Sequence, residues 1–236
     1  EEMFTSSTIE RLAKQLNEPA WLTELRRSAL ATHTALPWPH TSDDIWRRTD
    51  VSLLDPMRGF SPVGDALLQA VSLGESQFAS LAQPLGDEQL LVRANGSWVI
   101  PPPDSGRQRR PTGTPVASGE EAGGGMTDAR AQGLTVEDLT HAARAQPEPI
   151  RRILEADGMS PAEQKLTSLN AAFHHDDLVV QVPPHSVVSR PVRLVHLFAV
   201  SPQSAIFPTT IITVGSGSTL TLIDEYVSVD GSSQEG

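Results

Sequence analysis

Four of the seven histidines stand in or beside the strand-like final third of this chain, where imidazole groups could bind a metal. They are His174, His175, His185 and His196. A cupin-like enzyme would hold a divalent metal with a His-x-His pair and a later Glu. That spacing is absent, because His174 and His175 are adjacent and would point to opposite faces of a strand, while the other two stand alone. We therefore predict surface or core histidines and no metal ligand, with a cupin-like metal-dependent enzyme as the alternative.

Two other patterns carry side chains that are used in catalysis, Gly215-Ser216-Gly217-Ser218 and Asp224-Glu225. The first lacks the glycine spacing of a nucleophile elbow and the lysine of a phosphate loop, so we predict a tight turn between strands. The neighbouring carboxylates would alternate between the two faces of one strand, and no partner group for acid–base chemistry can be named. With no catalytic and no cofactor-binding residue identified, the sequence predicts a protein that is not an enzyme.

Charge and composition exclude several classes of protein. The 236 residues carry a formal net charge of −11 and contain no cysteine. A nucleic-acid backbone or an anionic membrane surface requires a basic face, which this balance does not supply. Thiolate metal sites and disulfides are excluded within the chain, and no apolar run approaches the roughly 20 residues of a membrane-spanning helix. We expect a cytoplasmic protein that binds neither nucleic acid nor membrane.

The final third contains short strand-like runs separated by proline and glycine. β-Branched and apolar residues dominate these runs, which cover 178–182, 192–200, 209–214 and 219–227. Runs this short are stable when successive coils stack and bury one another's apolar faces. We therefore predict an α+β fold in which a helical region leads into the start of a β-solenoid. Gly236 is expected to be a truncation that leaves the last coil open to self-association.

Apolar residues at helical spacing predict several helices before that region. Ser7 is the expected N-cap of the first helix, because a Glu follows it three residues later. Leu22 and Ala29 belong to the apolar stripe of the second helix, and Arg26 is expected to face away from that stripe. Val136 is expected within a further helix.

Changes in composition divide the chain into four parts. Residues 1–100 are predicted to form an N-terminal helical region, closed by a hairpin whose turn is Asn95-Gly96. Residues 101–133 are rich in proline and glycine, with too little apolar surface to offset the entropy of ordering, and are predicted to be a flexible linker. A helical lead-in at 134–175 and the first solenoid coils at 176–236 complete the division.

An ordered set of motifs runs through most of the chain. The earlier motifs are Glu18-Pro19-Ala20-Trp21-Leu22, Leu36-Pro37 and Trp46-Arg47 with Thr49-Asp50. The later motifs are Leu169-Asn170-Ala171-Ala172-Phe173, Val182-Pro183-Pro184, Pro191-Val192, Phe207-Pro208 and Leu220-Thr221-Leu222-Ile223-Asp224-Glu225-Tyr226. In this order and approximate spacing they resemble the SufB/SufD family, the scaffold proteins of the SUF system for iron–sulfur cluster assembly. The resemblance is greater to the SufD branch.

The resemblance implies a helical N-terminal region, a central right-handed parallel β-helix, and a C-terminal helical region that is missing here and docks the SufC ATPase. Family members are non-catalytic scaffold subunits that act with a SufB-like paralogue and a SufC-like ATPase. The family positions proposed for cluster binding lie beyond this chain, so none is carried onto its residues. Two residues depart from the family pattern, Thr209 in place of a common Arg and Asp177 in place of a common Gly. A β-solenoid interaction module of another pathway is a further alternative.

Overall fold

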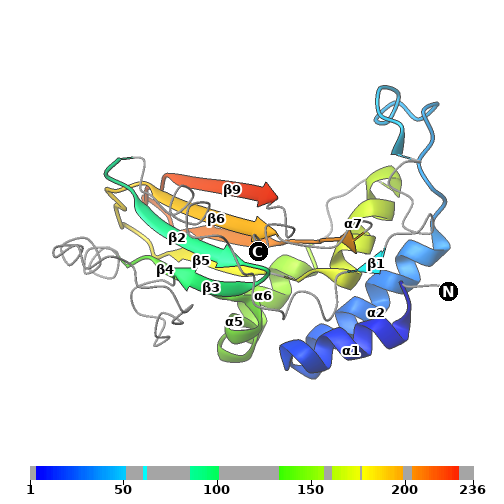
Figure 1. Ribbon diagram of the computed structural model, residues 1–236, viewed down its shortest axis with the longest axis horizontal. Coiled ribbons are helices and arrows are strands. Elements are labelled where there is room, and N and C mark those ends of the chain that lie inside the picture. The colour runs from blue at the N-terminus through cyan, green and yellow to red at the C-terminus, as the bar shows by residue number, and fades with distance from the viewer. Residues whose placement is uncertain are drawn as a thin grey trace, which may run out of the picture. The chain divides into compact units, whose positions relative to one another are not determined.

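The structure is a computed structural model, and it describes residues 4–51, 61–62, 86–100, 133–156, 161–175, 177–198 and 204–228 (Figure 1). It is a mixed α/β fold that divides into two compact units, each assembled from separate stretches of the chain. The helical unit comprises Glu1–Gly64, Asp138–Asp177 and Pro202–Thr209. The strand unit comprises Asp65–Glu137, Leu178–Ser201 and Thr210–Gly236. Within the described ranges, no helix is both long enough and apolar enough to cross a membrane.

Five described helices and one pair of very short strands form the helical unit. The helices are α1 (Ser6–Leu16), α2 (Ala20–Ala35), α5 (Leu139–Ala145), α6 (Pro147–Leu154) and α7 (Pro161–Phe173). The strands β1 (Ser61–Pro62) and β7 (Ser204–Ala205) pair in parallel. α2 packs along α7, and α1 packs against both.

The ends of α1 and the start of α2 follow from short-range chemistry. Thr5, and not the predicted Ser7, is the N-cap of α1, because its Oγ1 accepts a hydrogen bond from the backbone N–H of Thr8 at 3.3 Å. Asn17 ends the helix in the left-handed conformation with φ of 48°. Pro19 has extended backbone angles and precedes the first turn of α2.

An aromatic core fills the helical unit. Phe4 meets the rings of Phe173 and Phe207 edge to face, at centroid distances of 5.0 and 6.0 Å. Leu22 is buried as predicted, but Arg26 is buried as well, and the prediction that it faces solvent was wrong. A residue four positions after Leu22 lies one turn further along the same face of the helix, so Arg26 points inward with it.

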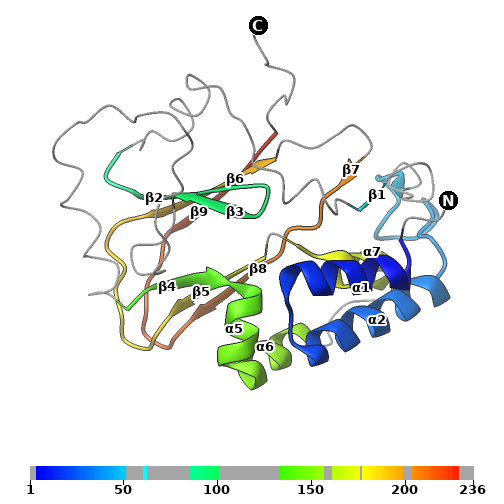
Figure 2. The ribbon, with the colours of Figure 1, turned by 60° about the horizontal axis from the view of Figure 1, so that its bottom comes forward.

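Two described sheets form the strand unit (Figure 2). The first has the order β3-β2-β6-β9, from Ser97–Ile100, Gln89–Ala94, Val192–Phe198 and Leu222–Ser228. The second has the order β4-β5-β8, from Thr135–Asp138, Leu178–Val182 and Thr210–Val214. Both sheets contribute buried side chains to one apolar core, with Leu91 and Leu194 from the first and Leu178 and Val180 from the second.

Successive strands repeat in parallel at a nearly constant spacing. Leu178 pairs with Thr210 in the second sheet, 32 positions later. Val187 bridges to Thr219, also 32 positions later. Val192 pairs with Leu222 in the first sheet, 30 positions later. One strand–turn–strand segment therefore lies directly on the next.

The turns between these strands stack as well. The backbone N–H of His185 donates to Ser216 O at 2.9 Å, and Gly215 N–H donates to Val182 O at 2.8 Å. His185 and Gly217 occupy equivalent places, 32 positions apart, and both have positive φ, at 59° and 70°. The predicted tight turn at residues 215–218 is confirmed.

Two further predictions have different outcomes. The hairpin at Asn95-Gly96 is confirmed, and both turn residues have positive φ, as a two-residue turn requires. Val136 lies in β4 and not in a helix, because β4 extends the sheet beside β5 and α5 begins only at Leu139. The proposed linker lies outside the described residues except for Gly133, and the four-part division of the chain stays a prediction.

Candidate functional site

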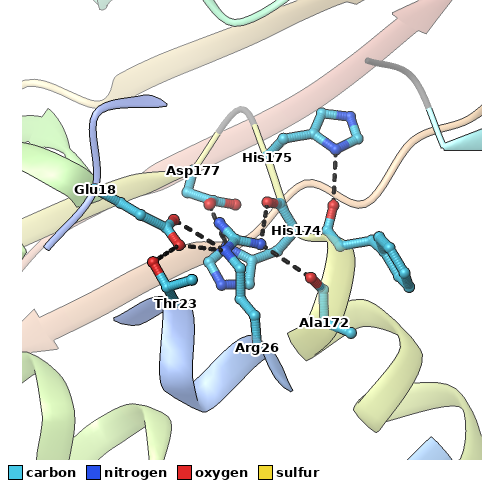
Figure 3. Close-up of polar contacts among 8 residues, drawn as sticks. Glu18, Thr23, Arg26, Ala172, His174, His175 and Asp177 are labelled. Carbon is cyan, nitrogen blue, oxygen red and sulfur yellow. Dashed lines mark hydrogen bonds and ion pairs between the residues drawn. The ribbon is translucent and has the colours of Figure 1, made fainter. Parts of the chain in front are cut away.

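A buried cluster of polar side chains lies beside the C-terminal end of α7 (Figure 3). We call it the Arg26 cluster, and it consists of Glu18, Thr23, Arg26, His174 and Asp177. The side chains of Glu18 and Arg26 are fully buried, and those of His174 and Asp177 are only 4% and 5% exposed. Charged groups are this deeply buried only when they are paired, so the contacts within the cluster must be extensive.

Arg26 is the centre of the cluster. Its Nε donates to both carboxylate oxygens of Glu18, at 3.1 and 2.9 Å, and Thr23 Oγ1 donates to the same carboxylate at 2.9 Å. Its Nη1 donates to the backbone oxygens of Ala172 at 3.3 Å and His174 at 2.8 Å. Its Nη2 lies 3.4 Å from Nδ1 of His174, which also contacts Asp177 Oδ2. The guanidinium thus joins α2 to the segment that follows α7.

The Arg26 guanidinium caps the C-terminal end of α7. The last carbonyl groups of a helix have no partner within the helix and carry partial negative charge. Arg26 supplies hydrogen bonds and a positive charge at that end, and Glu18 balances its charge. Removing one member of a buried ion pair leaves the other uncompensated and costs about 3–5 kcal/mol.

Asp177 and the neighbouring His175 fix the chain as it leaves α7. Asp177 O accepts from the N–H of Leu139 at the start of α5, and His175 N–H donates to Phe207 O at 3.0 Å. The imidazole of His175 contacts Phe173 O at 3.0 Å, and Figure 3 shows this ring pointing away from Arg26. The contacts of the cluster therefore position backbone, and its one hydroxyl, that of Thr23, donates to the Glu18 carboxylate that Arg26 already pairs.

The four candidate histidines have three different surroundings. His174 and His175 belong to the helical unit, where they follow the end of α7 outside any strand and point in different directions. His185 is exposed in the stacked turn. His196 is fully buried on β6, with its Nε2 3.2 Å from Asp224 Oδ1. Among the residues that the structure describes, no group of three or more His, Asp or Glu side chains is arranged to hold a metal.

The two neighbouring carboxylates Asp224 and Glu225 have separate partners. Asp224 contacts His196, whereas Glu225 Oε2 accepts from Arg193 at 2.8 Å. Arg193 Nη1 also lies 3.3 Å from Oε1 of Glu88. Burial lowers the pKa of the Arg193 guanidinium, but hydrogen bonds and charge attraction from Glu225 and Glu88 outweigh it, so its pKa is raised above the ordinary value. Arg193 therefore bridges carboxylates from two other segments of the strand unit.

The sequence patterns did not predict that Arg26 and Lys165 are buried. Lys165 on α7 is 6% exposed, and its Nζ lies 5.2 Å from the centre of the Trp38 ring. The signal for Arg26 was its spacing of four from Leu22 and seven from His33, which places all three on one helical face. Burial of a lysine has no comparable signal in the local sequence, because it depends on a segment far away in the chain.

Two motifs named above contact each other in the helical unit. Leu169 and Phe173 are buried in the aromatic core, and Phe207 packs against the same core. Thr209 Oγ1 donates to Asn170 Oδ1 at 3.1 Å. The threonine that departs from the family pattern thus makes a specific contact with the Leu-Asn-Ala-Ala-Phe motif.

These features define a mixed α/β protein with a helical unit and parallel strands that stack turn upon turn. No family model matches the chain. Over 227 residues, it is 23% identical to the iron–sulfur cluster assembly protein SufD of Bacillus subtilis (strain 168). The match covers 93% of this chain and 44% of that protein, so the chain spans less than half the length of the curated relative. The similarity supports a distant SufD-like relationship.

Proposed function

We propose that this chain is part of a SufD-like scaffold protein for iron–sulfur cluster assembly. The observation that carries the proposal is the similarity to SufD along 93% of the chain. Parallel strands repeating at 30 to 32 positions support it, because this is the local geometry of a β-solenoid. In this proposal the stacked strands are the first coils of a right-handed parallel β-helix.

The proposed role is non-catalytic, in a cytoplasmic complex with a SufB-like paralogue and a SufC-like ATPase. ATP hydrolysis would be supplied by the SufC-like chain. The cluster is cargo of the whole assembly, and its usual protein ligands are cysteine thiolates. This chain has no cysteine, which agrees with cluster ligands being provided elsewhere in the complex.

The two alternatives differ in what they require. A solenoid interaction module of another pathway would share the stacked strands but would not bind SUF proteins. A cupin-like enzyme would require a cluster of metal ligands, and among the described residues no group of three or more His, Asp or Glu side chains is arranged to hold a metal. Binding to SUF proteins therefore distinguishes the proposal from both.

The test is coexpression of the tagged protein with the SufB-like and SufC-like proteins of the same organism. Affinity purification followed by light scattering should give one complex that contains all three chains. Parallel preparations without the tagged chain, and with an unrelated acidic protein in its place, control for association of the other two. The proposal is contradicted if the SufB-like and SufC-like chains bind each other while the tagged protein elutes alone.

A further inference from the structure

The turn of the β2–β3 hairpin contains a chemically reactive pair of residues, Asn95 and Gly96 (Figure 2). Asparagine is a thermolabile residue, because the nitrogen of the next peptide bond can attack its side-chain amide. Glycine hinders this attack least, since it has no Cβ beside that nitrogen. The sequence contains one Asn-Gly pair, so the chain should react first at this turn.

The folded hairpin fixes the backbone on both sides of this pair. Ala94 pairs with Ser97 across the turn. Asn95 and Gly96 have φ of 43° and 79°, as a two-residue hairpin turn requires. The attack requires rotation about the Cα–C bond of Asn95, and that rotation would break the pairing of Ala94 with Ser97. The backbone N–H of Asn95 also donates to Leu197 O on β6 at 2.9 Å. The reaction therefore requires that the turn first open.

Arg93 holds the same turn through its guanidinium. Its Nη2 donates to Gly96 O at 2.7 Å, and its Cζ lies 4.7 Å from the centre of the Trp98 ring. Arg93 is 3% exposed and Asn95 is 4% exposed, so water reaches little of the turn. Contacts within the hairpin thus close the turn, in addition to its bond with β6.

We propose that Asn95 is a site of spontaneous deamidation that the folded hairpin protects and an opened hairpin exposes. The backbone nitrogen of Gly96 attacks Asn95 Cγ and forms a nitrogen–carbon bond. The side-chain amide nitrogen then leaves as ammonia and takes the proton of the attacking nitrogen. Water opens the resulting cyclic imide at either carbonyl group and leaves an aspartyl or an isoaspartyl residue. Water is the co-reactant, and nothing is oxidised or reduced.

The isoaspartyl product should disturb the hairpin. Its main chain gains one methylene group, so the two-residue turn no longer holds the register between β2 and β3. β2 covers one edge of β6, where it pairs from Gln89 with Val192 to Ala94 with Leu197. A hairpin altered at its turn should pair poorly with β6 and leave that edge open to other strands. Opening of the hairpin would thereby become irreversible.

Comparison of the folded and the unfolded protein tests the proposal. Samples are incubated at mildly alkaline pH with and without guanidinium chloride. Peptide mapping by mass spectrometry detects the small mass gain when a carboxyl group replaces the amide, and chromatography separates the aspartyl and isoaspartyl peptides. Asn95 should react in the denaturant and at least about tenfold more slowly in the native protein, because protection follows the free energy of local opening. Equal rates in the two samples, or an intact Asn95 in the denaturant, would overturn the proposal.

Matched arginine variants locate the protection in the hairpin. Arg93→Gln removes the contacts with Gly96 O and the Trp98 ring, and it should speed deamidation of the folded protein. Arg27→Gln removes exposed ion pairs on α2 and should leave the rate unchanged. Circular dichroism checks that each variant is folded. Equal rates for the two variants would contradict the protective role of the hairpin, and the wild-type comparison stands even if Arg93→Gln does not fold. The deamidation site does not rest on the scaffold proposal, because neither measurement involves the SUF proteins.

Discussion

Arg26 and Lys165 cap each other's helices. Arg26 on α2 donates to His174 O, at the C-terminal end of α7, at 2.8 Å. Lys165 on α7 donates to His33 O and Leu36 O, at the C-terminal end of α2, at 2.6 and 2.7 Å. Both cations are buried, and each meets the partial negative charge of a helix end. The two helices therefore depend on each other for capping as well as for packing.

Replacing Arg26 with Leu should destabilise the protein by about 3–5 kcal/mol, because the buried carboxylate of Glu18 loses its partner. Arg26→Lys should recover only part of the loss, since an ammonium group cannot reproduce the several directed contacts of a guanidinium. The free energy of unfolding from urea titrations measures both effects.

Arg27 provides the matched control for Arg26. It is the next residue on α2, and it forms exposed ion pairs with Glu10 and Glu24. Exposed pairs contribute little to stability, so Arg27→Leu should shift the urea midpoint much less than Arg26→Leu. Equal shifts for the two variants would contradict the role given to the buried guanidinium.

Lys165→Met should destabilise the protein by about 1–3 kcal/mol. Methionine retains most of the apolar stem but leaves the carbonyl groups of His33 and Leu36 without the ammonium donor. Trp38, which lies beside the ammonium group, should report the change through its fluorescence. Lys14→Met, on the exposed side of α1, is the control, and a loss of stability as large as that of Lys165→Met would argue against the cap.

Gly215→Ala should disrupt the stacked turn and destabilise the protein by about 1–3 kcal/mol, through overpacking. A Cβ at this position would lie 2.3 Å from the backbone nitrogen of Pro184. Pro184 belongs to the preceding stacked turn, so its backbone cannot move without shifting that turn. Gly86→Ala is the control, because a Cβ at Gly86 meets nothing within 4 Å. Thermal unfolding of the two variants, compared with wild type, measures the difference. A wild-type melting temperature for Gly215→Ala would show that the turns are not in close contact.

Arg193→Leu should cost about 3–5 kcal/mol, because the buried carboxylate of Glu88 loses its ion pair with the Arg193 guanidinium. The pKa of Arg193 is raised, so its stabilising effect is fully present below the ordinary arginine pKa and is lost only as the pH rises through the raised value. The destabilisation should therefore be the same at neutral and at mildly alkaline pH, as measured by urea unfolding at each. A loss that disappears between these two conditions would assign the effect to a different group.

Local patterns were sufficient to predict several elements of the fold. The run at 178–182 coincides with β5, and Asn95-Gly96 forms the turn between β2 and β3. In both cases the decisive information lies within a few residues, as a run of β-branched and apolar residues or as tolerance of positive φ. The turn at residues 215–218 follows from the same kind of evidence.

The contacts that join distant segments could not be predicted in this way. Arg26 binds His174 O, and His196 meets Tyr226, only after the fold has set which segments are neighbours. The spacing between paired strands could not be detected as a repeat in the sequence either, because it is 32 positions in one sheet and 30 in the other. The connection after Val188 is longer than the equivalent connection after Leu220, so no single period describes the sequence.

The position of β6 between β2 and β9 sets an order for folding. Val192 pairs with Leu222 on one side and with Gln89 on the other, and the second pair closes a loop roughly three times as long. Closing the longer loop costs more entropy, and contacts between remote segments slow folding. We therefore expect β6 to pair with β9 early in folding and the β2–β3 hairpin to pair with β6 late. Pairing of that hairpin with β6 should be the slow step in refolding.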